Sequence, residues 1–239
     1  GTELIAVNST RYIRRGTDMG SNALRLDMDA VRKRKYHNHY YNGTLDYTPN
    51  ENVKIGGYVL INNHERTKQE AVRSHFFYSS SQPDSSIATA NILKHTFKNF
   101  STGAHVTLQL GTGSKWENYV DRQQFRQAET QDQLLDKFGA DGSAMASQQE
   151  LRGETGGKVT ITTIQSKYLL DIRPNVAASF GGKLTQVDMH TRSLFQQAAD
   201  KHWQVRPELS NAFGHEEQLK ALFMQTRYNP SDVCQIVLG

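Results

Sequence analysis

Lys158-Val159-Thr160-Ile161-Thr162-Thr163-Ile164 is the clearest β-strand in this sequence of 239 residues. Most of its members are β-branched, and such side chains favour an extended backbone. Ala104 to Leu110 alternates polar and apolar residues up to Gly111, which also predicts a strand. Further strands are predicted over 4–16, 58–61 and 72–81, and 168–172 is expected to pair with the strand at 158–164.

Other parts of the sequence have patterns that are typical of helices. We predict helices over 22–35, 86–97 and 117–138. After Gln186, apolar residues such as Leu194, Phe195 and Ala198 recur near helical spacing, which predicts a helical C-terminal part from about residue 186. Residues 36–70 are expected to be mostly loop. These segments together predict an α+β fold, and residues 1–239 are expected to form a single domain.

The composition is that of a polar globular chain. Hydrophobic residues make up 36% of the sequence and the mean hydropathy is −0.66, which predicts a thin core and a very polar surface. No apolar run reaches about 18 residues, so no membrane span is predicted. Cys234 is the only cysteine, which excludes an internal disulfide and offers no zinc or redox site.

The charge is mildly basic, with a formal net charge of +4 at pH 7 and an isoelectric point near 9.1. The densest basic run is Arg32-Lys33-Arg34-Lys35, and the aromatic residues Tyr36, Tyr40 and Tyr41 follow it. No RNP-like, zinc-finger or helix-turn-helix pattern accompanies this run. A solvated basic surface is therefore the favoured interpretation, and a nucleic-acid partner is not expected.

A serine cluster ends one predicted strand. Phe77-Tyr78-Ser79-Ser80-Ser81 is followed by Ala88 in the next predicted helix. The cluster places hydroxyl groups and small side chains at the end of a strand. The alternative is a strand that runs into a serine-rich turn.

A strand arginine precedes this cluster, and a carboxylate follows it. Arg14 comes after Tyr12-Ile13, and Arg15, before Gly16, is the alternative registration. A guanidinium stays charged and offers forked donors, which suits a pyrophosphate. Gln148 and Glu150 lie two positions apart, so both face the same side of an extended segment. The alternative for this pair is a polar loop before a hairpin.

The three elements, in this order, resemble the bacterial mono-ADP-ribosyltransferase toxins of the Arg–Ser–Glu class, in their Gln-x-Glu variant. The resemblance implies a split two-sheet β core with surrounding helices, and NAD bound as a substrate in the cleft between the sheets. It implies that Glu150 stabilises the cation formed as nicotinamide leaves, that Gln148 positions the acceptor, and that Ser79 orients the glutamate. The NAD-binding residues that it implies are Arg14, Arg15, Ser80, Ser81 and Phe77, and it implies no metal.

The resemblance also implies a biological role. An NAD-dependent transferase (a glycosyltransferase) of this kind is a secreted virulence toxin or effector, which acts as a monomer on a target protein in the cytoplasm of a host or competitor cell. The sequence departs from the family at Ser80, where threonine is usual, and lacks the apolar-Pro step that often follows Glu150. The alternative function is that of a non-enzymatic viral or phage structural or nucleic-acid-binding protein, which the polar composition and the basic run favour.

Three other patterns have simpler interpretations. His105-Val106-Thr107 matches one half of a two-histidine phosphoesterase signature, but the second half is missing. Gly111-Thr112-Gly113-Ser114-Lys115 lacks the spacing of a phosphate-binding loop and predicts a turn. The histidines at 37, 39 and 64 are interpreted as solvated loop residues and not as metal ligands.

Overall fold

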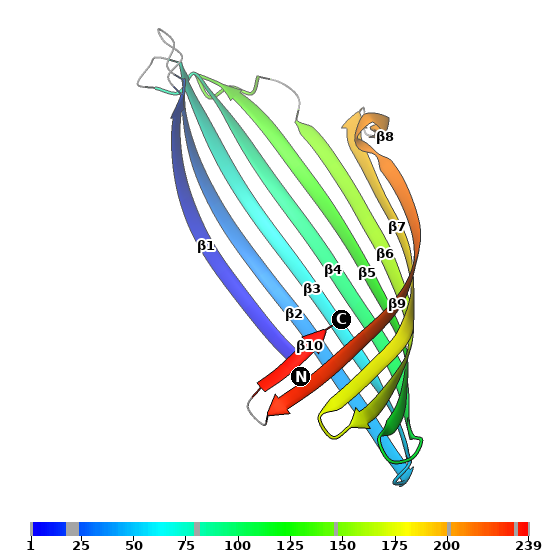
Figure 1. Cartoon of the computed structure of the whole chain (residues 1–239). Helices are drawn as coiled ribbons and strands as arrows, with labels where there is room; N and C mark the ends of the chain where they lie inside the picture. The colour runs from blue at the N-terminus through cyan, green and yellow to red at the C-terminus, as the bar shows by residue number, and fades with distance from the viewer. Residues whose placement is uncertain are drawn as a thin grey trace.

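The computed structural model describes residues 2–17, 24–78, 82–145, 148–199, 202–231 and 234–238. Within these ranges the chain forms one antiparallel sheet in which each strand pairs with the next along the chain, except that β9 follows β7 and the short β8 pairs with the end of β7 (Figure 1). The strands are β1 (Thr2–Thr17), β2 (Leu24–Asn50), β3 (Val53–Tyr78), β4 (Ser85–Gln109), β5 (Ser114–Gly139), β6 (Gln149–Arg173), β7 (Val176–Ala199), β8 (His202–Val205), β9 (Asn211–Ser231) and β10 (Cys234–Leu238), with one 3-10 turn at Pro207–Leu209.

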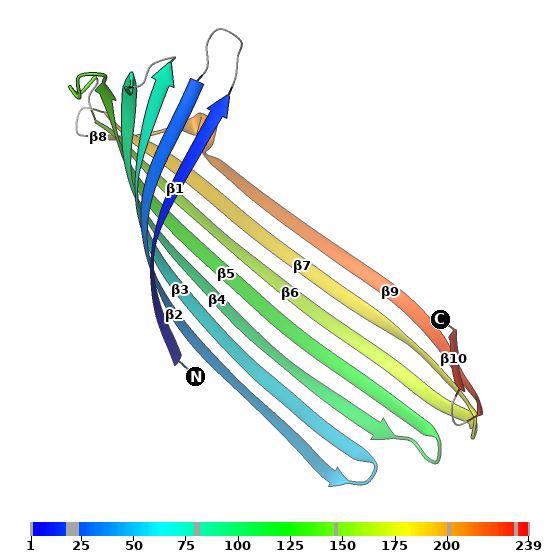
Figure 2. The same ribbon diagram turned by 90° about the vertical axis from the view of Figure 1, so that its left-hand side faces the viewer.

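The sheet curves into a long trough (Figures 1 and 2). Strands of 24 to 27 residues, β2 to β7, make up most of it. At about 3.3 Å per residue, each of them is roughly 80 Å long. Short turns join the strands at one end of the trough, and longer connections join them at the other.

The short turns are built from residues that permit tight backbone geometry. Gly111 and Gly113 connect β4 to β5 with φ of +114° and +85°, values that L-residues with a side chain rarely adopt. Leu110 closes this turn by donating its backbone N–H to Ser114 O at 2.9 Å. The turn predicted at 111–115 is therefore confirmed. Between β2 and β3 the Asn52 N–H donates to Asn50 Oδ1 at 3.0 Å.

The register divides the side chains between two faces, because directly paired residues point to the same side. Ile164 on β6 pairs with Val120 on β5 and Leu184 on β7, and these lie on the convex face. Thr163, one position earlier, lies with Asp121 on the concave face. The concave face is the more crowded: Ser101 on β4 is only 6% exposed. No large side chain of the described residues is fully buried, so the sheet has no separate hydrophobic core of its own.

The predicted α+β fold is wrong, because the segments expected to be helices are strands. Segments 22–35, 86–97, 117–138 and the part after residue 186 belong, where the structure describes them, to β2, β4, β5, β7 and β9. The segments 58–61, 104–109 and 158–164 are confirmed as strand, but 168–172 continues β6 and does not pair with 158–164. The physical reason is that polar side chains occupy both faces of the strands over long stretches. The alternation of apolar and polar residues, which marks a strand in a sequence, is therefore absent there. That residues 1–239 form a single domain stays a prediction.

Candidate functional site

A band of exposed apolar side chains crosses the convex face near the short turns. One row of it runs through Leu45, Ala104, Val120 and Ile164, which successive register pairs connect through Gly57. The exposed members, here called the apolar band, are Tyr41, Leu45, Tyr47, Ile55, Val59, Phe100, Trp116, Val120, Ile164, Leu170, Phe180, Leu222 and Met224. Leu45 is 75% exposed and Leu222 is 92% exposed. Water is an unfavourable surrounding for so large an apolar surface.

The height of the band matches the hydrocarbon layer of a membrane. On β4 the convex positions from Phe100 to Leu108 carry apolar side chains, except for Thr102. About nine residues at 3.3 Å each, inclined at 35–45°, cover roughly 20–25 Å along the membrane normal. Rows of aromatic residues mark its two borders: Phe100 and Tyr41, which Ile61 links in register, and Trp116, Tyr168 and Phe180. Aromatic girdles of this kind flank the lipid-facing surface of outer-membrane barrels.

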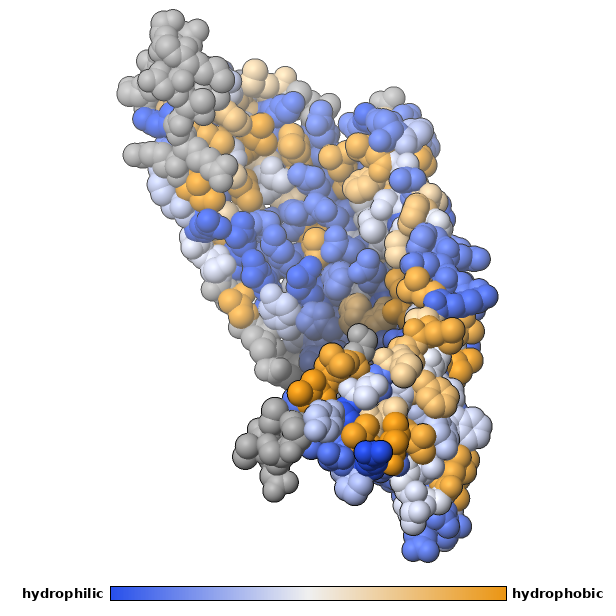
Figure 3. Space-filling view, viewed as in Figure 1, coloured by the Kyte–Doolittle hydropathy of each residue, from blue (hydrophilic) through white to orange (hydrophobic). Residues whose placement is uncertain are grey.

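Behind the band, the concave face is polar at the same level. Tyr58 donates its hydroxyl to Asp121 Oδ1 at 2.8 Å. Asp46 lies 3.6 Å from Lys54 Nζ and 3.4 Å from His105 Nε2. Figure 3 shows that most of the residues in the hollow of the trough are hydrophilic. Apolar residues therefore face outward and polar residues inward at one level, the inverse of a soluble sandwich.

Two glycines give these polar side chains their room. A Cβ on Gly103 would overlap the Tyr58 ring and the Asp121 carboxylate, and a Cβ on Gly56 would overlap Asp46 and His105. Each glycine thus accommodates side chains from a neighbouring strand on the crowded concave face.

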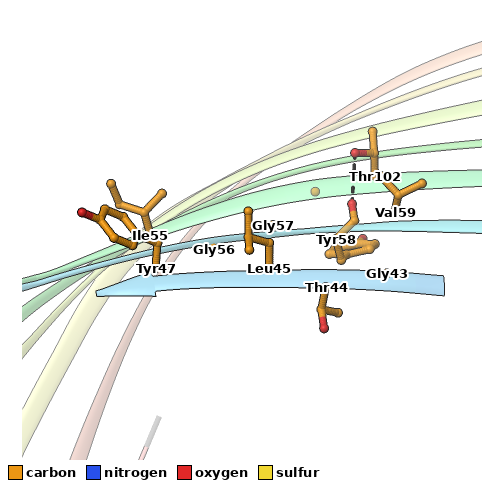
Figure 4. Close-up of a pocket in the computed structure, with 11 residues that line it drawn as sticks. Gly43, Thr44, Leu45, Tyr47, Ile55, Gly56, Gly57, Tyr58, Val59 and Thr102 are labelled. Carbon is orange, nitrogen blue, oxygen red and sulfur yellow. Dashed lines mark hydrogen bonds between the residues drawn. The ribbon is translucent and has the colours of Figure 1, made fainter. Parts of the chain in front are cut away.

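An open groove lies over β2 and β3, and most of its lining residues belong to the convex face (Figure 4). It is wide open, has a volume of about 780 Å³, and includes Leu45, Ile55 and Val59 from the apolar band. Gly43 shapes it, because no atom lies within 4 Å of where its Cβ would be. Thr102 at its edge donates its hydroxyl to Tyr58 O at 3.1 Å, so this polar group already has a partner within the sheet.

The basic run of the sequence is divided between the two faces beyond the band. Arg32 and Lys68 both contact Glu70 on the concave face, the lysine at 2.7 Å. Lys33 and Lys35 lie on the convex face instead. Burial raises the pKa of Glu70, but hydrogen bonds from Lys68 and Arg32 outweigh it and hold that pKa below its usual value. The run is therefore no continuous basic patch.

The structure does not bring the predicted catalytic residues together. Phe77 is buried near the end of β3, with the Arg25 guanidinium 3.8 Å from its ring centroid. Glu150 lies at the start of β6, three strands away, and successive register pairs place it level with Ala71 on β3. Strand spacing and rise separate it from Phe77 by roughly 20 Å or more. Gln148 precedes β6 and is exposed.

The remaining predicted residues are placed only in part. Arg14 and Arg15 lie on β1, where their backbones pair with Asp27 and Leu26 of β2, five strands from Glu150. Ser79, Ser80 and Ser81 lie outside the described residues. Glu150 itself lines a small convex pocket with Arg152 and Trp203.

Two features are absent from the described residues. No cluster of three or more His, Cys, Asp or Glu side chains there is placed to hold a metal ion. No helix there has the length and hydropathy of a membrane span.

Comparison with protein families agrees with this geometry. The profile of the Outer membrane protein beta-barrel family matches residues 109–236, more than half of the chain. The chain belongs to this family. As an outer membrane barrel protein it spans the bacterial outer membrane with strands.

Solved structures similar to this outer membrane barrel chain include one transporter and two receptors. The ferric citrate transporter FecA is 11% identical, with a TM-score of 0.38, and the match covers 99% of this chain and 40% of FecA. The siderophore receptor PiuA from Acinetobacter baumannii is 8% identical, with a TM-score of 0.39 and coverages of 97% and 47%. The ferric yersiniabactin uptake receptor FyuA from Yersinia pestis is 8% identical, with a TM-score of 0.34 and coverages of 95% and 40%. The chain thus spans less than half the length of each, and no curated protein sequence matches it.

Family membership corrects the functional predictions. The ADP-ribosyltransferase resemblance is wrong, and with it the NAD-dependent enzyme and the toxin or effector role. The predicted absence of a membrane span and the delivery into a target cell are also wrong, because the barrel lies in the bacterial outer membrane. The prediction of NAD as a substrate depended on that activity and is not carried forward. The residues that sequence reasoning missed are those of the apolar band. Their signal is apolar residues at alternate positions near the short turns, which is clearest on β3 and β4 and is interrupted on β5 by Asn118 and Arg122.

Proposed function

We propose that this chain forms part of the wall of an outer-membrane barrel whose concave face lines an aqueous passage for polar solutes. The observation that carries the proposal is the opposite polarity of the two faces at one level: Ile164 and Val120 face outward where Thr163 and Asp121 face inward. Lipid surrounds the outer face, and water is the compatible surrounding for the inner one.

The passage needs strands beyond the described sheet to close it. The edge of β2 over Tyr41–Tyr47 has no strand partner among the described residues, although it crosses the apolar band. A lipid bilayer does not tolerate unpaired backbone groups, so in the membrane another strand pairs with this edge. The long strands also extend well beyond the band, which makes a deep polar vestibule on the side of the longer connections.

Solute flux through reconstituted protein tests this proposal. Vesicles that contain the protein are expected to admit a small uncharged sugar faster than empty vesicles, as measured by swelling. Thr163→Trp places a large side chain on the concave face and is expected to reduce the flux several-fold. Thr162→Trp is the matched control, because it places the same side chain on the convex face of the same strand.

Two outcomes would overturn the proposed passage. One is flux no greater than that of empty vesicles when the barrel is folded. The other is an equal effect of Thr162→Trp and Thr163→Trp on the flux, since that would show that the concave face does not line the passage.

A further inference from the structure

A row of basic side chains crosses the convex face beyond the apolar band and lies nearest to it on β4. Lys98 on β4, Arg126 on β5 and Lys158 on β6 are directly paired in register, and His190 on β7 continues the row. Arg192 follows two positions along β7. All five side chains are exposed, and we call them the basic row.

The basic row surrounds a hollow and is not spread over a flat surface. Its five members all line one open pocket of about 520 Å³. Small residues, Ala128 and Gly156, lie between the basic side chains and leave the space above the backbone empty. The positive groups therefore converge on a volume that a compact anion could occupy.

The positive charge of this pocket is largely uncompensated. His190 lies 3.0 Å from the Asp188 carboxylate. In the described part of the chain, no carboxylate is within ion-pair distance of Lys98, Arg126, Lys158 or Arg192. By contrast, Arg152, further out on the same face, pairs with Asp132 at 2.7 Å. Cations left without protein partners at one level favour an external anion there.

The position of the basic row relative to the apolar band indicates which kind of anion would bind there. Lys98 is two positions beyond Phe100, the aromatic residue at the border of the band, which is about 7 Å along the strand. Arg126 and Lys158 are six positions beyond Val120 and Ile164, so the row lies nearest to the apolar band on β4. A group bound there has water on one side and hydrocarbon on the other. Lipid phosphates occupy this level, and basic side chains at a membrane surface attract them. Short turns face the periplasm in outer-membrane barrels, so the row lies at the outward leaflet.

We infer that the basic row binds the phosphate-bearing headgroup of a lipid in the outward leaflet, with the acyl chains of the same molecule against the apolar band. The inference rests on the placement of the convex face in lipid. It does not depend on solute flux, because none of the five residues lies on the concave face. A soluble anion would gain nothing from the adjoining apolar surface, whereas a lipid contacts both.

Native mass spectrometry of the full chain, purified in a neutral detergent, tests this inference. Phosphatidic acid supplies a phosphate monoester on two acyl chains, and diacylglycerol is the matched lipid without the phosphate. The protein is expected to retain phosphatidic acid and not diacylglycerol. The combined variant K98Q/R126Q/K158Q is expected to bind phosphatidic acid about tenfold or more weakly. K98R/R126K/K158R, which keeps the charges, is expected to retain most of the binding.

The matched control is K33Q/K35Q/K94Q, which removes the same charge from the convex face further from the band. It is expected to change the affinity by less than about twofold, because charges away from the headgroup level contribute little. Heat-dependent gel mobility verifies folding. If the combined variant does not fold, the affinity for phosphatidic acid is compared for the single variants K98Q, R126Q and K158Q.

Three results would overturn the inference. Equal retention of phosphatidic acid and diacylglycerol would show that the phosphate is not recognised. Equal losses in the variant and the control would show that only net charge matters. Displacement of the lipid by an equal concentration of inorganic phosphate would show a site for a free anion.

Discussion

Glycine placement decides how the polar inner surface packs. Gly56 and Gly103 lie where side chains from neighbouring strands cross the concave face, and each position is filled by an aromatic or imidazole ring together with a carboxylate. The Tyr58–Asp121 hydrogen bond depends on this space. At the residue scale, then, the absence of a Cβ permits a hydrogen-bonded network in the lumen.

Gly103→Ala is expected to destabilise the protein by about 1–3 kcal/mol, because the new Cβ overlaps Tyr58 and Asp121. Gly43→Ala is the control, since its Cβ would have no atom within 4 Å. The free energy of unfolding in lipid vesicles, from urea titration, gives the comparison. Equal stability of the two variants would contradict the packing described for Gly103.

At the scale of the element, each strand combines two environments. We expect β6 to cross the membrane around Ile164 and Leu170, and the part before Thr160 to extend beyond the lipid. Within the membrane part, only the convex positions need apolar side chains. The two faces of one strand therefore tolerate opposite substitutions.

Ile164→Arg places a charge on the convex face near the middle of the band and is expected to cost about 2–4 kcal/mol. Thr163→Arg is expected to be tolerated, because the neighbouring position faces the polar concave side. The fraction of protein that folds into vesicles, read from heat-dependent gel mobility, distinguishes the two. If both variants fold equally well, β6 does not cross hydrocarbon at this level.

The elements that the sequence predicted correctly are those in which alternation and β-branching coincide. Val159, Ile161 and Ile164 made β6 evident, and Gly111 marked the turn after β4. Strand β5 was missed, because Gln and charged residues occupy the concave face and also the convex face outside the band. Its apolar Leu134 and Leu135 are adjacent, which no single face explains.

The candidate site was missed for a related reason. Local motifs around Phe77 and Glu150 suggested one active site, whereas strand pairing separates them by three strands. The apolar band is formed by residues such as Leu45, Val120 and Ile164, which are far apart in sequence and are brought to one row by the pairing of the strands. A surface of this kind becomes visible only when hairpins of about 25 residues per strand are aligned at their short turns.

At the scale of the whole molecule, the mean hydropathy of the sequence does not indicate that the chain lies in a membrane. A value of −0.66 is that of a polar soluble chain, and it led to the prediction of no membrane span. Long polar strand extensions and a polar concave face outweigh the apolar band in the average. A barrel wall needs only a thin outward stripe of apolar residues, so the distribution of hydropathy on the folded sheet decides its surroundings.

Cysteine accessibility along β6 tests the account most directly. In a Cys234→Ser background, single cysteines are placed at each of residues 161–166 and the protein is reconstituted in vesicles. A water-soluble maleimide is expected to label 161, 163 and 165, and a reagent confined to the bilayer is expected to label 162, 164 and 166. Labelling without alternation, or with the two sets exchanged, would contradict the placement of the convex face in lipid and the concave face in water.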